Sequence, residues 1–200
     1  MTGLKLLAMV TMVLFASSKM TLMAHQQVAN IGDISELNGV AQILRNSAIN
    51  EAELKLGIQS NDEAITTNGR MAITFLDDSK VKLTEHSQLL IDEYIYDPDP
   101  SKSKMALTFA LGTTRFITGN LNRIDKQNIS LKTPTANISI RGTDFTATVD
   151  ELGRSLVILL PDKFGLSSGE IEVITAVGSV ILNMSLIHIS DPTRPIDISY

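Results

Sequence analysis

The chain has 200 residues, of which 44% are hydrophobic, and its mean hydropathy is +0.14. These values suit one globular domain with a processed segment and exclude an intrinsically disordered chain. The formal net charge is -5 and no run of basic residues occurs, which excludes a nucleic-acid surface built from clustered Lys and Arg. The chain has no cysteine, so disulfides and thiolate zinc sites are excluded too.

Residues 1–24 have the composition of a signal peptide. They contain no acidic residue, carry Lys5 near the start, and are apolar from Leu6 to Phe15 before small and polar residues follow. We predict cleavage after Ser18 or after Ala24, and the sequence leaves both sites open. The alternative is an uncleaved N-terminal anchor, although the apolar run is shorter than the roughly 20 residues that a membrane span needs.

Residues 25–183 alternate apolar and polar side chains almost throughout, which is typical of half-buried β-strands. The apolar positions expected to form the core are Met71, Ile73, Phe75, Val81, Leu83, Leu89, Ile91, Leu107, Phe109 and Leu111. Turn residues separate the alternating segments and imply hairpins and corners at Asn38–Gly39, Asn68–Gly69, Asp77–Ser79, Asp97–Ser101 and Ser167–Gly169. Residues 46–60 have weak periodicity and are expected to form a loop. The sequence therefore predicts one all-β domain.

The segment ISLKTPTANISIRGTDFTATV, residues 129–149, predicts three short strands with two interruptions. Pro134 lacks an N–H group and marks a corner. Gly142 allows a positive φ or a close backbone approach, so we expect a bulge or tight bend there. Phe145 is expected to enter the core where the alternation resumes.

The order of these features resembles the FecR domain family, which is named for an iron-citrate signalling regulator of Gram-negative bacteria. The segments that carry the resemblance are IGDISELNGVAQILR, NDEAITTNGRMAITFLDDSKVKLTEHSQLLI, LTFALGTTRF and ISLKTPTANISIRGTDFTATV. The last segment is similar to the family's most diagnostic pattern, tP-x-A followed a few residues later by GT-x-F. The resemblance implies an exported all-β domain, in a twisted solenoid-like or sandwich-like arrangement, that makes protein contacts.

Two features depart from the family pattern. The turn Asp77–Ser79 has Asp78 where the family usually has glycine, so Asp78 is expected to take the left-handed conformation. Only Met1–Leu4 precede Lys5, whereas the signalling regulator carries a cytoplasmic sigma-binding segment before its transmembrane helix. A cytosolic anti-sigma role is therefore not expected.

Three residues are candidates for contact with a partner. Tyr94 and Tyr96 share one face of a predicted strand, either as an exposed aromatic pair or as part of the core. Arg141 lies at the diagnostic bend with Thr143 and Asp144, where a structural role is the simpler interpretation.

Candidates for catalysis or metal binding are few. His86 is expected to be a solvated strand histidine, and Glu85 beside it would face the opposite side of the strand. An acidic segment supplies oxygen atoms but lacks the glycine and the closing Glu of a calcium loop, so we expect a solvated turn. Its members are Asp92, Glu93, Asp97 and Asp99. No catalytic residue, metal, cofactor or small-molecule substrate is assigned.

Residues 184–200 depart from the preceding β pattern. Ser185–Ile189 is the translation of TCT CTT ATA CAC ATC, which resembles the transposon-end adapter of sequencing libraries. The next residues differ from the continued adapter by one acidic exchange, at Asp191. We therefore expect a non-native tail here and assign His188 no functional role.

Two function hypotheses follow. The first is an exported, non-enzymatic FecR-like domain, periplasmic or at the cell surface, that contacts an envelope protein in signalling or assembly. The contact would use exposed strand edges or the Tyr94 and Tyr96 surface. The alternative is a structural or cell-wall and carbohydrate-associated surface module that forms the N-terminal part of a longer protein. Contact with a membrane is expected only through an uncleaved leader.

Overall fold

The computed structural model describes residues 29–119, 128–141, 144–162, 164–166 and 169–183, together with the backbone of residues 187–190. The described chain forms a 14-stranded sheet and contains no α-helix, which confirms the predicted all-β fold. The predicted signal peptide lies outside the described residues. In chain order the strands are β1 (Gly32–Arg45), β2 (Ala48–Glu51), β3 (Gly57–Ile58), β4 (Glu63–Phe75), β5 (Lys80–Leu83), β6 (Gln88–Ile95), β7 (Lys104–Ile117), β8 (Ile129–Lys132), β9 (Asn137–Arg141), β10 (Asp144–Val149), β11 (Ser155–Leu159), β12 (Glu170–Thr175), β13 (Gly178–Leu182) and β14 (Ile187–Ser190).

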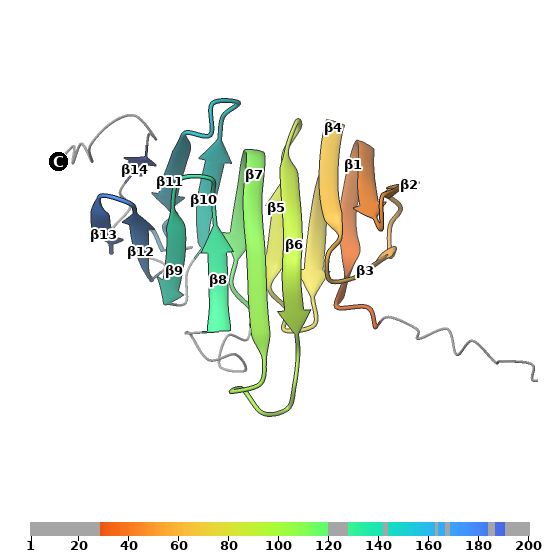
Figure 1. The fold of residues 1–200 in the computed structure, drawn as a ribbon, viewed down its shortest axis with the longest axis horizontal. Coiled ribbons are helices and arrows are strands. Elements are labelled where there is room, and N and C mark those ends of the chain that lie inside the picture. The colour runs from red at the N-terminus through yellow and green to blue at the C-terminus, as the bar shows by residue number, and fades with distance from the viewer. Residues whose placement is uncertain are drawn as a thin grey trace, which may run out of the picture.

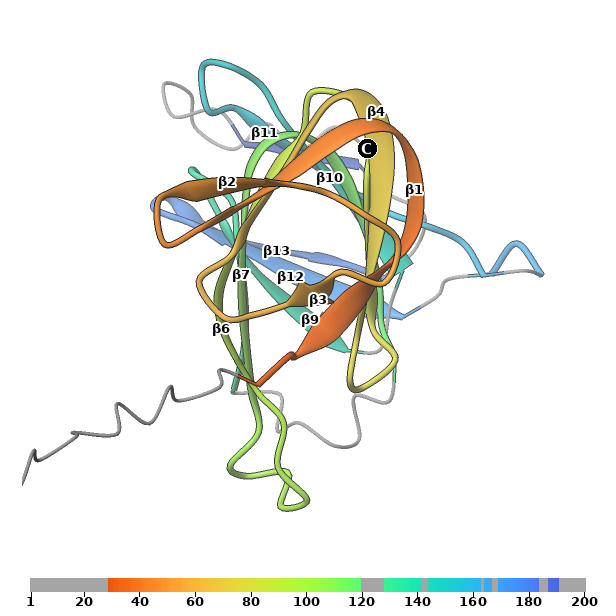
Figure 2. The same cartoon turned by 90° about the vertical axis from the view of Figure 1, so that its right-hand side faces the viewer.

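The sheet folds back on itself into two layers, seen face-on in Figure 1 and along the long axis in Figure 2. The first layer has the order β2-β1-β4-β6-β7-β8-β9-β12-β13. The second has the order β3-β1-β4-β5-β7-β10-β11-β14. Strands β1, β4 and β7 belong to both layers, because different halves of each strand pair in different layers. The layers are those of a sandwich, and the crossing strands resemble the coils of a solenoid.

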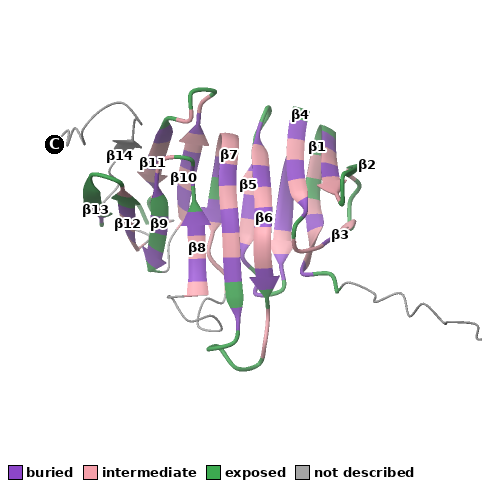
Figure 3. Ribbon diagram, in the orientation of Figure 1, coloured by how far each residue is buried: buried purple, intermediate pink, exposed green. Residues whose placement is uncertain are grey.

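The core lies between the two layers and takes a side chain from every second position along the strands (Figure 3). All the expected core positions are buried except Leu111, which is half-buried. Phe109 of the first layer meets Phe145 of the second edge to face, with ring centroids 6.0 Å apart. The ring of Phe116 lies 5.6 Å from that of Phe145. Phe145 therefore joins the layers at the centre of the core, as its position in the alternation predicts.

The two Asn-Gly dipeptides are strand corners and not hairpin turns, so the structure selects one of the two interpretations that the sequence left open. Asn38–Gly39 lies within β1, Asn68–Gly69 lies within β4, and Gly39 pairs directly with Gly69. The φ of Gly39 is 78°, and a Cβ atom there would lie 2.3 Å from the carbonyl oxygen of Asn68. The two backbones thus approach each other too closely for a side chain where β1 and β4 pass from one layer to the other.

The third crossing strand turns the same kind of corner. Gly112 of β7 has a φ of 76° and lies between the half that pairs with β6 and the half that pairs with β5. The chain changes layer again between Arg141 and Asp144, because β9 pairs in the first layer and β10 in the second. Gly142, at the predicted bend, lies outside the described residues.

Other turn predictions are confirmed. Residues 129–149 contain three strands, β8, β9 and β10, and Pro134 lies in the turn that Thr133 closes by donating its N–H to the Ala136 carbonyl at 2.8 Å. The turn at Asp77–Ser79 joins β4 to β5, and Asp78 has the expected positive φ, 64°. The turn at Asp97–Ser101 lies between β6 and β7.

Residues 46–60 are more than the expected loop, because they contain two short strands. β2 forms a hairpin with the end of β1, and β3 pairs with the start of β1. All four residues of β2 are exposed. A strand with no buried face needs no alternation, so its periodicity is weak.

The backbone of residues 187–190 forms β14, which pairs with β11 at the edge of the second layer. This pairing does not test the origin of residues 184–200, so the non-native tail stays a prediction. Residues 184–186 and 191–200 lie outside the described chain, as does most of the predicted turn at Ser167–Gly169.

Candidate functional site

Tyr94 is a core side chain, so the structure selects one of the two interpretations that the sequence left open. Tyr94 is 3% exposed, and its ring stacks on that of Phe75 at a centroid distance of 5.1 Å. The hydroxyl donates to Oδ1 of Asp77 at 3.0 Å and accepts from the Asp77 N–H at 3.1 Å. Asp77 also accepts from the Ser79 hydroxyl at 2.6 Å. Tyr94 thereby ties β6 to the turn after β4 and has no aromatic surface to offer a partner.

Burial, together with the Asp77 carboxylate, raises the pKa of Tyr94 far above its usual range. In the unfolded chain the phenol ionises near pH 10, so at higher pH the unfolded state loses a proton that the folded state keeps. The contribution of Tyr94 to stability is therefore complete below about pH 10 and is lost as the pH rises above it. We expect the free energy of unfolding of the natural chain to fall by about 1 kcal/mol more between about pH 10 and pH 11 than that of Tyr94→Phe.

Urea unfolding followed by circular dichroism, at several pH values on both sides of the phenol pKa, measures this difference. Tyr94→Phe keeps the other two tyrosines of the chain, so it is its own control for their ionisation. Two proteins whose stabilities fall in parallel would contradict the prediction.

Of the remaining partner candidates, Arg141 does not join Tyr94 in one site. Tyr96 is half-buried and packs against the core. Arg141 has a largely exposed side chain and forms an ion pair with Glu170, 3.0 Å between Nη1 and Oε1. Two strands, β7 and β8, separate β6 from β9 in the first layer, so Arg141 lies apart from both tyrosines. Thr143 lies outside the described residues.

His86 lies in the turn between β5 and β6, with a φ of 54°, so its predicted place on a strand was wrong. The side chain is exposed, as predicted. The turn forms here because the chain must pass from β5 in the second layer to β6 in the first. Glu85 lies in the same turn and not on an opposite strand face.

The acidic carboxylates before and after Tyr94 take separate partners. Asp92 accepts from the Thr108 hydroxyl at 2.7 Å, and Glu93 forms an ion pair with Lys104 at 2.5 Å. Asp99 accepts from the Ser101 hydroxyl at 2.8 Å. Within the described residues, no group of three or more His, Asp or Glu side chains could hold a metal ion.

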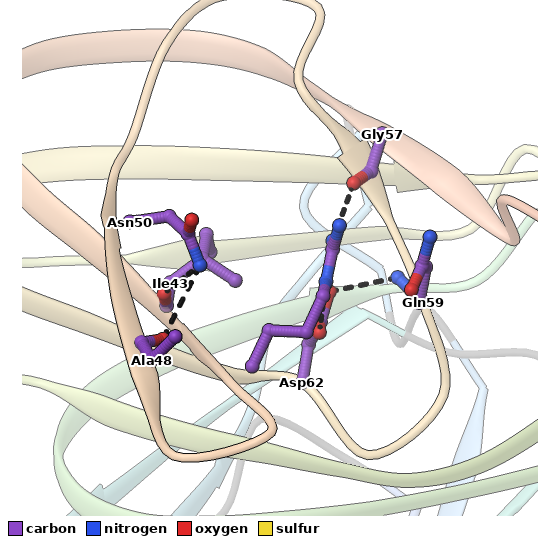
Figure 4. Close-up of polar contacts among 7 residues, drawn as sticks. Ile43, Ala48, Asn50, Gly57, Gln59 and Asp62 are labelled. Atoms are coloured by element: carbon purple, nitrogen blue, oxygen red, sulfur yellow. Dashed lines mark hydrogen bonds and ion pairs between the residues drawn. The ribbon is translucent and has the colours of Figure 1, made fainter. Parts of the chain in front are cut away.

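A buried ion pair that the sequence analysis missed lies at the β3 end of the domain. Asp62 is 0% exposed and accepts from Nε and Nη2 of Arg45 at 2.7 and 2.6 Å. It also accepts from the Gln59 N–H at 2.8 Å, and Nη2 of Arg45 donates to the Gly57 carbonyl at 2.7 Å. Figure 4 shows Gly57, Gln59 and Asp62 gathered by these contacts. The pair fastens the end of β1 to β3 and to the turn before β4.

A groove on the outer face of the second layer was also missed. Its floor is a row of residues in direct register across β1, β4, β5, β7 and β10, namely Glu36, Ala72, Lys82, Arg115 and Thr146. We call these five residues and the space above them the outer groove, which has a volume of about 450 Å³. Alternation in the sequence shows that each of these positions faces away from the core. It does not show that they lie side by side.

The β12–β13 hairpin ends the first layer and carries apolar side chains exposed to solvent. Of the described strands, β12 alone pairs with β13. The exposed side chains are Ile174, Val177 and Ile181, which we call the end patch. Unpaired strand edges of this kind can accept a strand from another chain.

Comparison with protein families finds a match between residues 62–172 and the family model described as FecR protein. Two solved structures of a protein from Parabacteroides distasonis ATCC 8503, provisionally described as an anti-sigma factor, are similar at 13% and 14% identity, each with a TM-score of 0.48 over 64% of this chain. The chain spans 54% of the length of those structures. A comparison with curated proteins finds no match. The part of the chain that the structure describes contains no helix long and apolar enough to cross a membrane.

Proposed function

The chain belongs to the FecR family, and from this premise we propose that it is an exported, non-enzymatic β domain that contacts a protein partner in envelope signalling or assembly. The family is a regulatory, non-enzymatic kind of protein and is associated with the cell envelope. The observation that carries the proposal is the family match over residues 62–172, which runs from the start of β4 into β12. Export is supported by the leader-like composition of residues 1–24.

The partner contact is proposed to lie at the β13 edge. With Tyr94 in the core, strand edges are the contact surface that remains from the sequence-based hypothesis. β13 has an edge to which a partner strand can add backbone hydrogen bonds. The end patch places apolar side chains on the outer face of the same hairpin, because Ile174 and Ile181 alternate with the buried Val173 and Leu182. Backbone pairing and apolar contact therefore coincide at this end of the domain.

Site-specific photo-crosslinking in cells that express the full chain tests this proposal. A photo-reactive amino acid in place of Ile181 should give a discrete crosslinked protein, identified by mass spectrometry. The same residue in place of Val40, an exposed position of β1 at the far end of the sheet, is the matched control and should give no such product. Absence of a product at Ile181, or equal products at both positions, would overturn the contact. Crosslinking to cell-wall material would instead favour the structural alternative.

A further inference from the structure

The outer groove places two cations at directly opposite positions of neighbouring strands. Lys82 of β5 is in register with Arg115 of β7, and like charges at such positions destabilise a sheet. Each cation forms an ion pair with an acidic side chain on the side away from the other cation. Lys82 reaches Glu36 across the small Ala72, with 2.8 Å between Nζ and Oε1. Arg115 forms a two-pronged pair with Asp144 through Nε and Nη2.

Each ion pair favours the charged form of one of its members. The hydrogen bond from Lys82 lowers the pKa of the Glu36 carboxyl, and the hydrogen bond to Asp144 raises the pKa of the Arg115 guanidinium. The pairs are open to solvent, since the side chains of Lys82 and Arg115 are 39% and 46% exposed. Exposed pairs of this kind contribute little to stability. A bound anion can therefore form hydrogen bonds with the same two cations. The pair with Asp144 uses the Nε and Nη2 edge of Arg115 and leaves the Nη1 edge for another acceptor.

The rest of the lining completes a site for an anion with hydrogen-bonding groups. Arg70 adds a third cation to the lining and forms an ion pair with Glu85, 3.4 Å between Nε and Oε1, so each of the three cations has an acidic partner. Asn38, Thr84 and Thr113 add an amide and hydroxyls, and Leu37, Met71 and Leu83 add apolar groups. Among the described residues, no aromatic side chain lines the groove, which makes it unlike the stacking platforms that bind bases. Charge-assisted hydrogen bonds from Arg and Lys are the usual means of holding carboxylates.

We infer that the outer groove binds a short acidic segment of a protein partner in an extended conformation. The row crosses five strands, which at the usual spacing spans about 19 Å, the length of about six extended residues. Alternate side chains of an extended segment face the same way, so acidic residues at alternate positions would both reach the floor. The inference rests on the proposed function, because it names a second contact for the same kind of partner.

A peptide-binding measurement on the full chain tests the inference directly. The probe is a blocked, dye-labelled peptide of about six residues with two glutamates at alternate positions, compared by fluorescence anisotropy with the same peptide carrying glutamines. We expect the glutamate peptide to bind at least about tenfold more tightly, and Lys82→Gln and Arg115→Gln each to weaken its binding about tenfold. Lys102→Gln makes the same charge change at an exposed side chain between β6 and β7 and should leave binding unchanged.

Three results would overturn the inference: equal binding of both peptides, absence of binding, or the same weakening by Lys102→Gln as by the groove variants. Thermal melts establish that each variant is folded, and Lys82→Gln carries the test alone if Arg115→Gln fails to fold. The crosslinking at Ile181 separates the two proposals. If the peptide does not bind and the Lys82→Gln chain is crosslinked to its partner equally well, the groove inference is overturned and the proposed function stands. If the peptide binds but no crosslinked protein is found at Ile181, the proposed function remains overturned.

Discussion

Arg45→Met is expected to lower the free energy of unfolding by about 3 kcal/mol. The substitution leaves the carboxylate of Asp62, which is 0% exposed, without the two hydrogen bonds that Arg45 donates at 2.7 and 2.6 Å. Of the hydrogen bonds described above, Asp62 retains the one from the Gln59 N–H. Methionine fills much of the volume of arginine, so the measured loss reports the unpaired buried charge rather than a cavity. Urea unfolding at neutral pH measures the change.

A matched ion pair at the surface supplies the control. Arg154→Met removes the partner of Asp150, which Nε of Arg154 reaches at 2.6 Å on the exposed β10–β11 turn. That change should cost less than about 1 kcal/mol, because exposed pairs contribute little. The double variant Arg45→Met with Asp62→Leu should recover most of the loss, since it removes the buried carboxylate together with its partner. Equal effects of Arg45→Met and Arg154→Met would contradict the prediction.

Phe145→Ala is expected to have an effect of similar size, a loss of about 4 kcal/mol. Phe145 is 0% exposed, and its ring contacts those of Phe109 and Phe116. Alanine would leave a cavity between the layers, and both ring contacts would be lost as well. The position is the phenylalanine of the family's diagnostic pattern, so the prediction assigns that pattern a role in joining the two layers. Equilibrium unfolding in urea, followed by circular dichroism, measures the loss.

Leu152→Ala is the control within the same β10–β11 hairpin, because Leu152 is 72% exposed. It should change the free energy of unfolding by less than about 0.5 kcal/mol. A loss in Phe145→Ala no larger than in Leu152→Ala would show that Phe145 does not join the layers. A large loss in Phe145→Ala with an unchanged dependence on urea concentration would show that the variant still folds and unfolds as one unit.

Local patterns predicted the strands well but did not distinguish corners from hairpin turns. Alternation identified the buried side of β4, β5, β6 and β7, because a strand with one covered face must repeat every second residue. The Asn-Gly dipeptides at residues 38–39 and 68–69 suit a hairpin turn equally well as a corner, since both need a residue with positive φ or no side chain. Only the direct pairing of Gly39 with Gly69 distinguishes the two.

The surroundings of the candidate residues could not be predicted for a related reason. Alternation placed Tyr94 and Tyr96 on one face of a predicted strand, but it did not say that Phe75 and Asp77 of other segments cover Tyr94. The buried pair of Arg45 and Asp62 joins residues separated by 17 positions, with no local pattern to reveal it. The signal that exists is weak, an arginine and an aspartate at the two ends of a loop.

The sequence by itself determined the all-β class, the side chains that enter the core and the positive φ of Asp78, because each depends on neighbours along the chain. The tertiary structure decided which layer each half of β1, β4 and β7 joins, that Tyr94 is covered, and that Lys82 and Arg115 lie opposite each other. These features depend on register between strands distant in the sequence, and a shift of one residue would turn every side chain of a strand to the other face. The sequence therefore predicts which side chains face out, and the pairing of strands decides which of them form a site.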